Sequence, residues 1–254
     1  MTSKKTKHRR VLAPWDANCR RQTRMEGDPH GVYDVGEENA RQDPLKVCNF
    51  YGRVFFVNDN VLTPRPETEA IVDEVLSLCG KPILPGVKPK KPVLNPQNLT
   101  ILDVGTGSGC IAITLKKELE EANIYASDIS EKAIKIARKN AEKLSAHITT
   151  IISYLCQNVN ITPNLIVANL PYVDGNWDWL DKKALSYEPD IALYAKDHGL
   201  KLIKELIDQS SIKNIPYLIL EADPCQHEEI IKYAKKQKLA LRKTYGFILV
   251  FSKK

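Results

Sequence analysis

The sequence predicts an α/β fold in which a mostly parallel β-sheet carries helices on both faces. Short apolar segments alternate with helical segments through residues 99–251, a pattern typical of parallel strands joined by crossover helices. A glycine-rich turn at residues 105–109 directly follows the first apolar segment. Only Tyr245-Gly246 separates the last two apolar segments, so we expect an antiparallel hairpin at one edge of the sheet.

The chain divides into three parts. Residues 1–42 are polar and basic and show no hydrophobic period, so we expect a disordered N-terminal tail. Residues 43–98 are expected to hold a small β-hairpin, a lid helix and a proline-rich loop. Residues 99–254 are expected to form the core domain.

The second part begins with apolar and aromatic residues that predict the hairpin over residues 50–62, with its turn at Asn58-Asp59-Asn60. Helical spacing of apolar residues predicts the lid helix over residues 67–79, and Pro66 suits a helix start. Five prolines in residues 80–98 indicate an extended loop.

The core domain alternates between two kinds of segment. Strands are predicted over residues 99–104, 123–127, 148–152, 165–168, 216–220, 239–244 and 247–251. Helices are predicted over residues 111–119, 131–144, 198–207 and 228–238. Seven strands in this order predict a Rossmann-like sheet, and such sheets bind ligands at the carboxyl ends of their parallel strands.

The positive charge of the chain is concentrated at its start. The net charge is +6, but residues 1–24 hold eight Lys and Arg against one Asp, and the remaining 230 residues carry 29 bases and 30 acids. A nearly neutral body argues against a domain that grips duplex nucleic acid. The basic tail is either a simple solvated segment or an arm that attracts RNA or the ribosome.

Other bulk features favour a cytoplasmic location. No apolar run approaches the roughly 20 residues that span a bilayer, so we expect no membrane segment. The basic start is not followed by the apolar region of a signal peptide, and a transit peptide is the alternative reading. The six cysteines and five histidines are widely scattered, with no Cys-x-x-Cys pair. We therefore expect reduced thiols and no metal site.

The glycine-rich turn is the first candidate binding element. It joins a buried strand to a helix with the spacing Gly-x-Gly-x-Gly, and Cys110 stands where a dinucleotide fingerprint needs a glycine. A cofactor without a pyrophosphate, such as S-adenosyl-L-methionine, fits this turn better, although a structural turn is the alternative. The candidate cofactor-binding residues of this element are Asp103, Gly105, Thr106, Gly107, Ser108 and Gly109.

Two further positions extend the predicted cofactor site. Asp128 ends the next strand, nineteen residues after Gly109, where a carboxylate can accept both hydroxyls of a ribose. Together with the turn, this interval indicates an adenosine-containing cofactor. The strand over residues 148–152 should end beside the adenine, and Tyr154 is the candidate contact there; a surface tyrosine is the alternative.

The segment Asn169-Leu170-Pro171-Tyr172 follows the fourth strand and carries the predicted chemistry. An amide nitrogen is a weak nucleophile, so a catalyst must hold the NH2 group in line with the methyl donor. The Asn169 side-chain oxygen and the Leu170 carbonyl can accept its two N–H groups, and Pro171 fixes the turn. Tyr172 can pack over the planar group. Asn169, Pro171 and Tyr172 are therefore the candidate catalytic residues, with Asn169 also beside the cofactor.

The segment Thr63-Pro64-Arg65-Pro66-Glu67-Thr68-Glu69 closely resembles the signature of the HemK/PrmC family, the release-factor glutamine methyltransferases. The resemblance extends over residues 44–251, through the motifs Tyr187-Glu188-Pro189 and Asp197-His198-Gly199-Leu200, and through Glu221 and Gln226.

This resemblance implies a class I S-adenosylmethionine-dependent methyltransferase fold. It implies methylation of the glutamine side chain in the Gly-Gly-Gln motif of a peptide chain release factor. It also implies that Arg65, Glu188 and residues 169–172 bind the substrate. We expect the protein to act as a monomer.

Two departures keep other readings open. Leu170 stands where the family usually has proline, and Asn-Leu-Pro-Tyr is also common in ribosomal-RNA adenine dimethyltransferases. About forty polar residues stand in place of the family's helical N-terminal domain. The alternative is therefore an adenine-N6 methyltransferase that acts on ribosomal RNA or DNA. The nearly neutral charge of residues 25–254 and the family-like residues 65–69 argue against this alternative. A degenerate fold used for binding alone is disfavoured by the intact glycine turn, Asp128 and Asn169.

Overall fold

The computed structural model describes residues 33–34, 45–83, 88, 91–178, 180 and 188–253. Of the predicted tail, only the two-residue strand β1 (Tyr33–Asp34) belongs to the described residues. The predictions of tail disorder, and of a role for its basic charge, therefore lie outside them, as do Cys19 and Tyr187.

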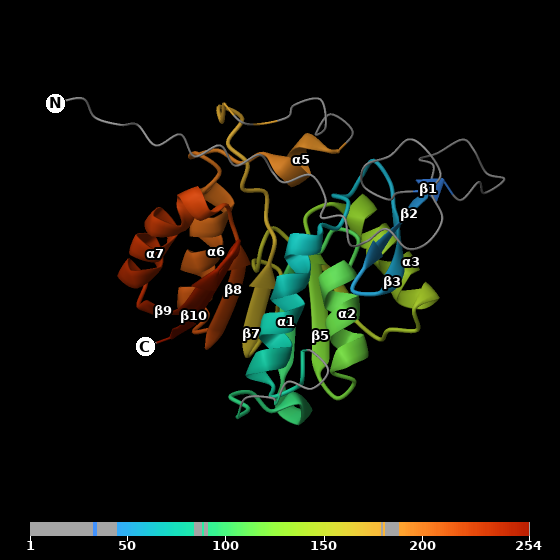
Figure 1. The fold of residues 1–254 in the computed structure, drawn as a ribbon, viewed down its shortest axis with the longest axis horizontal. Coiled ribbons are helices and arrows are strands. Elements are labelled where there is room, and N and C mark those ends of the chain that lie inside the picture. Colours follow the sequence, from blue (N-terminus) through green and yellow to red (C-terminus); the bar gives the residue numbers. More distant parts are fainter. Residues whose placement is uncertain are drawn as a thin grey trace.

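The core is a seven-stranded sheet with the order β6-β5-β4-β7-β8-β10-β9 (Figure 1). Its strands are β4 (Thr100–Val104), β5 (Asn123–Asp128), β6 (Thr149–Ile152), β7 (Leu165–Ala168), β8 (Tyr217–Glu221), β9 (Leu239–Tyr245) and β10 (Ile248–Lys253). The first five strands in the order pair in parallel, and β10 runs antiparallel to both of its neighbours. The predicted class I fold with an antiparallel edge hairpin is confirmed.

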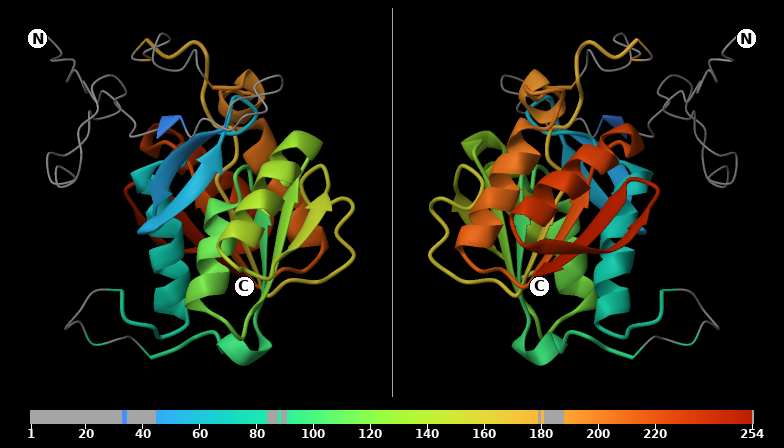
Figure 2. Two further views of the ribbon diagram at one scale, coloured as in Figure 1. Left: turned by 90° about the vertical axis from the view of Figure 1, so that its right-hand side faces the viewer. Right: turned by 90° about the vertical axis from the view of Figure 1, so that its left-hand side faces the viewer.

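Helices cover both faces of this sheet (Figure 2). One face carries α1 (Glu69–Leu78), α2 (Cys110–Glu118) and α3 (Glu131–Lys143), and the other carries α6 (Lys201–Ile212) and α7 (His227–Lys236). Alternate residues of β4, β7, β8 and β10 enter different hydrophobic clusters: Ile101 packs beneath α1 and α2, and Leu102 packs beneath α6 and α7. Burial on both sides explains why these strands are continuously apolar in sequence. No helix in the described part of the chain is both long and apolar enough to cross a bilayer.

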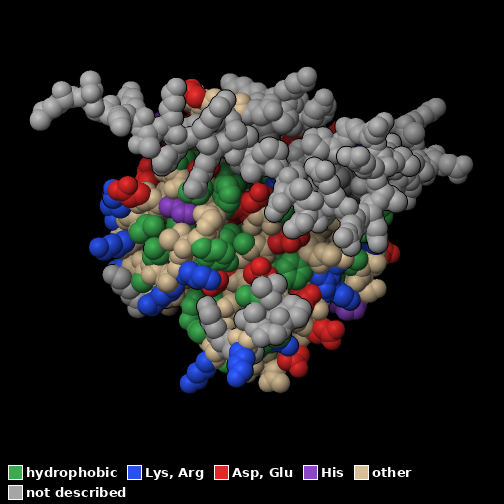
Figure 3. All heavy atoms as spheres, in the orientation of Figure 1, with side chains coloured by type: hydrophobic (Ala, Val, Ile, Leu, Met, Phe, Trp, Pro, Cys, Tyr) green, Lys and Arg blue, Asp and Glu red, His purple; other side chains and the backbone are tan. Residues whose placement is uncertain are grey.

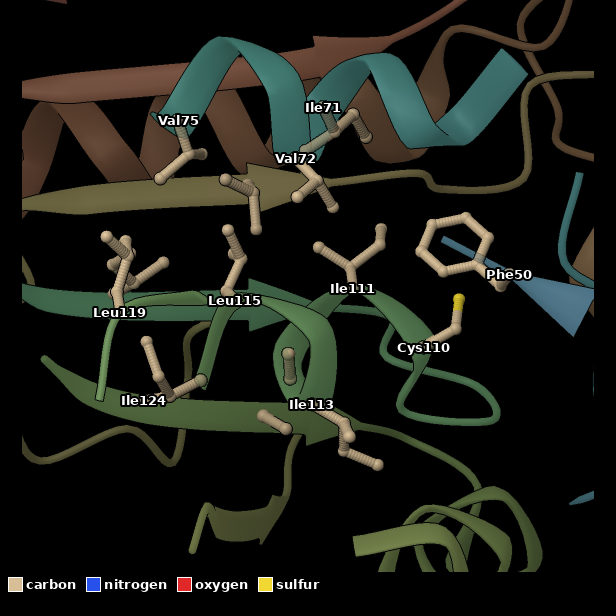
Figure 4. Packing of buried hydrophobic residues seen from close by; sticks show 14 of the residues in the cluster. Phe50, Ile71, Val72, Val75, Cys110, Ile111, Ile113, Leu115, Leu119 and Ile124 are labelled. Atoms are coloured by element: carbon tan, nitrogen blue, oxygen red, sulfur yellow. The ribbon is translucent and has the colours of Figure 1, made fainter. Parts of the chain in front are cut away.

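The contact between α1 and α2 attaches the second part of the chain to the core. Figure 4 shows Ile71, Val72 and Val75 of α1 facing Ile111 and Leu115 of α2. All five side chains are buried. Fully burying one aliphatic side chain of this size contributes about 1.5–3 kcal/mol, so α1 and the segment before it are held firmly on the sheet.

The small hairpin is confirmed, but its predicted turn position is wrong. β2 (Lys46–Phe50) pairs antiparallel with β3 (Arg53–Val57) through a turn at Tyr51-Gly52, where φ is 51° and 71°. Two positive φ values are the geometry of a tight hairpin turn. The residues Asn58-Asp59-Asn60 form a separate turn that ends β3, closed by a Val61 N–H to Asn58 O bond of 3.2 Å.

Two predicted helix starts also need correction, and one short helix was not predicted. A 3₁₀ turn, η2 (Pro66–Thr68), precedes α1. α6 begins at Lys201 and not at residue 198, because Asp197, His198 and Gly199 all have positive φ. The short helix α5 (Asp190–Leu193) was not predicted; Figure 1 shows it beyond the carboxyl ends of the parallel strands. Two further 3₁₀ turns are η3 (Pro96–Asn98) and η4 (Pro224–Gln226).

One buried side chain joins α3 to the hairpin and to the glycine turn. Asn140 accepts a hydrogen bond from the Phe56 N–H at 2.7 Å and donates to the Phe56 carbonyl at 2.9 Å. Its Nδ2 also donates to the Ser108 carbonyl at 2.8 Å. The Asn140 side chain therefore satisfies both backbone groups of Phe56 in β3, and it also holds the backbone of the glycine turn at Ser108.

We expect Asn140→Ala to lower the free energy of unfolding by about 1–3 kcal/mol, because it leaves buried backbone groups of Phe56 and Ser108 unpaired. Urea denaturation followed by circular dichroism measures the change. Asn123→Ala, which truncates an exposed amide on β5, is the control and should change stability much less. Equal stabilities for the two variants would contradict this role of Asn140.

Candidate active site

The candidate active site lies where the strand order of the sheet reverses direction. β4 and β7 are neighbours, but the chain continues from β4 toward β5 and β6, and from β7 toward β8 on the other side. Segments that leave two such strands diverge, and α/β proteins bind ligands between them. The glycine turn (residues 105–109) follows β4, and the predicted catalytic segment (residues 169–172) follows β7. The structure thus brings the two main predicted elements together.

The three glycines of the turn serve different purposes. All have positive φ, at 73° for Gly105, 53° for Gly107 and 83° for Gly109, a region that strongly favours glycine. A Cβ on Gly105 would lie 2.9 Å from Leu170 Cδ2, and one on Gly109 would lie 2.9 Å from Ile113 Cδ1. A Cβ on Gly107 would meet nothing within 4 Å. Packing therefore requires two of the glycines, and Gly107 is where a ligand can approach the backbone.

Asp103 holds the start of the turn in place. Its Oδ2 accepts hydrogen bonds from the Thr106 hydroxyl at 2.6 Å and from the Ala112 N–H at 3.2 Å. Its Oδ1 is buried and has no hydrogen-bond partner among the described residues. Burial raises the pKa of this carboxyl to about 7. Thr106 and Ser108 are buried as well, so the side chains of the turn support its shape.

Asp128 is joined directly to the glycine turn. Its Oδ2 accepts the Gly107 N–H at 2.9 Å, and its Oδ1 accepts the Ser130 N–H at 2.9 Å. Burial raises the pKa of Asp128, and these backbone N–H groups oppose that shift. Each carboxylate oxygen has a second lone pair, so the group can still accept hydroxyls. The next residue, Ile129, leaves 53% of its surface exposed and offers an apolar surface beside the acid.

Asn169 contacts the segment that carries the family resemblance. Its Nδ2 donates a hydrogen bond of 2.9 Å to Oγ1 of Thr68, 101 residues earlier in the chain. Thr68 lies in η2 and is only 3% exposed. Because the amide nitrogen donates to Thr68, the amide oxygen of Asn169 is the atom left to accept a hydrogen bond from a substrate. The sequence pattern around Thr68 signalled the family, but it did not reveal this contact.

Glu221 receives the other polar side chains of this cluster. It ends β8, is 2% exposed, and accepts the Tyr172 hydroxyl at 3.2 Å on Oε1. Burial raises its pKa from 4.5 to about 7, and hydrogen bonds from Thr68 and Tyr172 oppose the shift. The charge of Glu67 raises this pKa further and that of Arg65 lowers it. The segment over residues 63–69 therefore lies against the end of β8 as well as against Asn169.

The backbone of the catalytic segment is held from a third direction. Gln226 Nε2 donates to the carbonyls of Tyr172 at 2.8 Å and of His198 at 2.9 Å. Gly199 has φ of 82°, and a Cβ there would lie 1.9 Å from the Tyr172 carbonyl oxygen. His198 Nδ1 lies 2.9 Å from Asp174 Oδ2, and this hydrogen bond raises the pKa of the imidazole. The motifs around residues 197–200 and 221–226 thus fix the backbone of the predicted catalytic segment at Tyr172.

Three predicted site residues have partners within the protein. Arg65 and Glu188 form an ion pair of 2.6 Å, and Glu188 also accepts the Thr63 N–H at 3.3 Å. Tyr154 donates its hydroxyl to Glu205 of α6, a bond that raises the tyrosine pKa to about 12. Substrate binding by the pair and adenine contact by Tyr154 both remain predictions.

Leu170 was predicted to bind the substrate, and no metal site was predicted. The Leu170 side chain is 4% exposed and packs against Gly105, so its side chain belongs to the core. Within the described ranges, no group of three or more His, Cys, Asp and Glu could hold a metal ion.

The raised pKa of Glu221 predicts a pH dependence of stability. Between pH 4.5 and about 7 the folded protein holds this proton more tightly than the unfolded chain, so the contribution of Glu221 to stability falls as pH rises through that range. Glu221→Gln removes the titration. We compare the variant with wild type at each pH. The change in the free energy of unfolding caused by Glu221→Gln should be about 1–3 kcal/mol more stabilising at pH 8 than at pH 5.

Thermal unfolding of wild type and variant at both pH values measures this difference. The control is Glu228→Gln, an exposed carboxylate whose pKa Lys232 lowers, which should not reproduce the gain at pH 8. A Glu221→Gln effect that is independent of pH would contradict the assignment of a buried, titrating carboxyl.

Comparison with known proteins agrees with this geometry. The profile of the family described as "Methyltransferase small domain" matches residues 91–182. Among solved structures, a ribosomal protein L11 methylase from Lactobacillus delbrueckii subsp. bulgaricus superposes with a TM-score of 0.52 and 21% identity, over 76% of this chain and 82% of that one. The T. thermophilus 16S rRNA N2 G1207 methyltransferase gives a TM-score of 0.56 with 12% identity, over 83% and 50%. At these identities the likeness concerns the fold alone.

Curated relatives are more similar in sequence. The release factor glutamine methyltransferase of Mycoplasma mycoides is 36% identical over 180 residues, which are 69% of this chain and 57% of that protein. The corresponding protein of Enterococcus faecalis is 37% identical over 168 residues, 65% of this chain and 55% of that protein. This chain therefore spans little more than half the length of those two. The relative from Flavobacterium psychrophilum, also a release factor glutamine methyltransferase, is 35% identical over 219 residues, 85% of this chain and 71% of that protein. These matches confirm the resemblance predicted from residues 63–69, and the chain belongs to the release factor glutamine methyltransferase family.

Proposed function

We propose that this protein transfers a methyl group from S-adenosyl-L-methionine to the side-chain amide nitrogen of the glutamine in the Gly-Gly-Gln motif of a translation release factor. The observation that carries the proposal is the Asn169 carboxamide, which donates to Thr68 and so keeps its oxygen to accept an N–H. Relatives named release factor glutamine methyltransferase support the choice of substrate. We further propose that the protein acts in the cytoplasm as a monomer.

The residues beside β4 and β5 fit the cofactor. The open approach to Gly107, the carboxylate of Asp128 and the exposed apolar Ile129 offer a backbone surface, a hydroxyl acceptor and a packing surface. A nucleoside joined to an amino acid needs all three and needs no phosphate site. When bound, S-adenosyl-L-methionine supplies a methyl group on a positively charged sulfonium.

The residues after β7 then hold the acceptor. The lone pair of an amide nitrogen is delocalised, so orientation of the NH2 group must supply much of the catalysis. The Asn169 oxygen accepts one N–H, and the Leu170 carbonyl, on a backbone fixed by Pro171, accepts the other. The Tyr172 ring packs on the planar amide while its hydroxyl is anchored on Glu221. The nitrogen gains the methyl carbon and releases one proton.

Charge favours a protein acceptor over a polyanion. Outside residues 1–24 the chain carries 29 bases and 30 acids, and on the face in Figure 3 basic and acidic side chains are interspersed. Such a surface gives little general attraction for nucleic acid. The Leu170 side chain does not favour adenine either, because it packs in the core.

Cofactor binding should depend on Gly107. We expect Gly107→Val to weaken binding of S-adenosyl-L-methionine at least about tenfold (1.4 kcal/mol), because the added side chain fills the space through which a ligand reaches the turn. The matched control is Gly246→Val, since Gly246 has the same φ of 53° and the same open surroundings far along the chain. Titration calorimetry on both folded variants separates backbone strain from lost binding. Normal binding by Gly107→Val would remove the cofactor assignment.

The substrate test offers release factor and ribosomal RNA side by side with radiolabelled cofactor. We expect label on the release factor alone, and none on a release factor whose Gly-Gly-Gln glutamine is replaced by glutamate, which lacks the NH2. Asn169→Ala should bind cofactor normally and transfer at least about tenfold more slowly. Label on RNA with an unmodified release factor would establish the adenine alternative and overturn the proposal.

A further inference from the structure

The segment from Glu221 to Gln226 holds Tyr172 at two points. Glu221 Oε1 accepts the Tyr172 hydroxyl at 3.2 Å. At the other end of the segment, Gln226 Nε2 donates to the Tyr172 carbonyl at 2.8 Å. The same nitrogen donates to the His198 carbonyl at 2.9 Å. One side-chain amide therefore joins the segment that follows β7 to the turn that precedes α6.

Backbone groups alone fix the orientation of the Gln226 amide. The Asp223 N–H can only donate, and Gln226 Oε1 accepts it at 3.2 Å. The carbonyls of Tyr172 and His198 can only accept, so the NH2 group of Gln226 must face them. No titratable group takes part in these three bonds. If the amide turned over, all three bonds would be lost, so Gln226 has one favoured orientation at any pH at which the protein is folded.

The turn before α6 is shaped to reach this amide. Asp197 and His198 have φ of 57° and 52°, a region in which residues with a Cβ are uncommon. At Gly199, where φ is 82°, a Cβ would lie 1.9 Å from the Tyr172 carbonyl oxygen and 2.5 Å from Gln226 Nε2. A backbone of this kind is kept only where surrounding contacts fix it, and here it brings the turn directly against Tyr172.

We propose that Gln226 is a positioning residue that holds Tyr172 in place against the acceptor amide, by donating its two amide protons to the Tyr172 and His198 carbonyls. The inference rests on the proposed function, which assigns the Tyr172 ring the role of packing on the acceptor. Gln226 itself is only 5% exposed and acts without touching the acceptor.

The hydrogen bonds of Gln226 lie on the acceptor side of the site. On the cofactor side, Asp103 accepts the Thr106 hydroxyl and Asp128 accepts the Gly107 N–H. None of these bonds involves Gln226. Loss of the Gln226 bonds should therefore displace Tyr172 while the glycine turn keeps its own support, so that methyl transfer suffers and cofactor binding does not.

The test uses Gln226→Glu, which keeps the shape of the side chain and an oxygen for the Asp223 N–H but loses both donors. We expect kcat to fall at least about tenfold, with the cofactor Kd and the cofactor KM changed less than about threefold. Gln226→Met removes the same donors without adding a charge; it should show the same split, and it serves if Gln226→Glu does not fold. A normal kcat, or a matching loss of cofactor affinity, would overturn the proposal.

The matched control is Asn164→Ala. Asn164 Oδ1 accepts the Thr100 N–H at 2.8 Å, where β4 and β7 begin, at the edge of the sheet opposite to the site. Its loss should lower the thermal stability, as the Gln226 variants do, but leave kcat within about twofold of wild type. A comparable fall of kcat in Asn164→Ala would show that the rate follows stability alone and would contradict the proposal.

A double-mutant cycle tests whether Gln226 acts through Tyr172. In the Tyr172→Ala background there is no ring to hold, so Gln226→Glu should lower the remaining kcat less than about threefold. A further loss of about tenfold would show that Gln226 acts on another group, and the positioning of Tyr172 would have to be given up.

The two proposals fail in different ways. Every variant is compared with wild type on whichever acceptor wild type labels. If wild type labels RNA, the proposed function fails, and the Gln226 series on that acceptor still shows whether Tyr172 is positioned through Gln226. If wild type labels release factor but the variants behave as wild type, the positioning proposal alone fails.

Discussion

The close approach of two turns at the carboxyl ends of β4 and β7 is the constraint on which the rest of the site depends. Gly105 and Leu170 pack so closely that a Cβ on the glycine would lie 2.9 Å from the leucine side chain. This contact ties the glycine turn to the segment that follows β7. Asp103 holds the turn by accepting the Thr106 hydroxyl, and Asp128 holds it by accepting the Gly107 N–H. Asn169, the proposed catalytic residue, is the neighbour of Leu170, so any shift of this packing would move it too.

Two buried carboxyl groups hold neighbouring side chains of the site by hydrogen bonds, and their burial costs stability. Asp103 and Glu221 are both enclosed, both have a pKa raised to about 7 by burial, and each has one oxygen with no partner among the described residues. A hydrophobic core of ordinary design would avoid such groups. They lie at the ends of β4 and β8, on either side of the catalytic segment, where fixed polar groups can hold a substrate without reorganisation during the reaction. Directional bonds therefore act beside the packing of Leu170 on Gly105 in holding this part of the molecule.

The sequence predicted what local patterns determine and missed what distant contacts determine. The seven core strands lie within two residues of their predicted bounds; the four strands β4, β7, β8 and β10 are buried on both faces and so form apolar runs. The hairpin turn was misplaced because Asn58-Asp59-Asn60 is a stronger turn signal than Tyr51-Gly52, where a tyrosine adopts positive φ and is held by Glu69. The contact of Thr68 with Asn169 joins residues 101 positions apart, and no periodicity or spacing could reveal it. The motif resemblance brought Glu221 and Gln226 to attention without showing what they bind.

Within the Asn-Leu-Pro-Tyr segment, one side chain serves packing and two others make polar contacts. Asn169 and Tyr172 direct their polar groups to Thr68 and Glu221, while the residue between Asn169 and Pro171 turns its side chain into the core against the glycine turn. Under the proposed function this position contributes to the site through its backbone carbonyl alone, so leucine or proline would present the same atom to the acceptor. Identity at this position therefore carries little information about whether the acceptor is an amide or a base. The 63–69 segment contacts Asn169 through Thr68 and is held to Glu188 through Arg65, so we propose that this segment, and not Leu170, helps to select the acceptor.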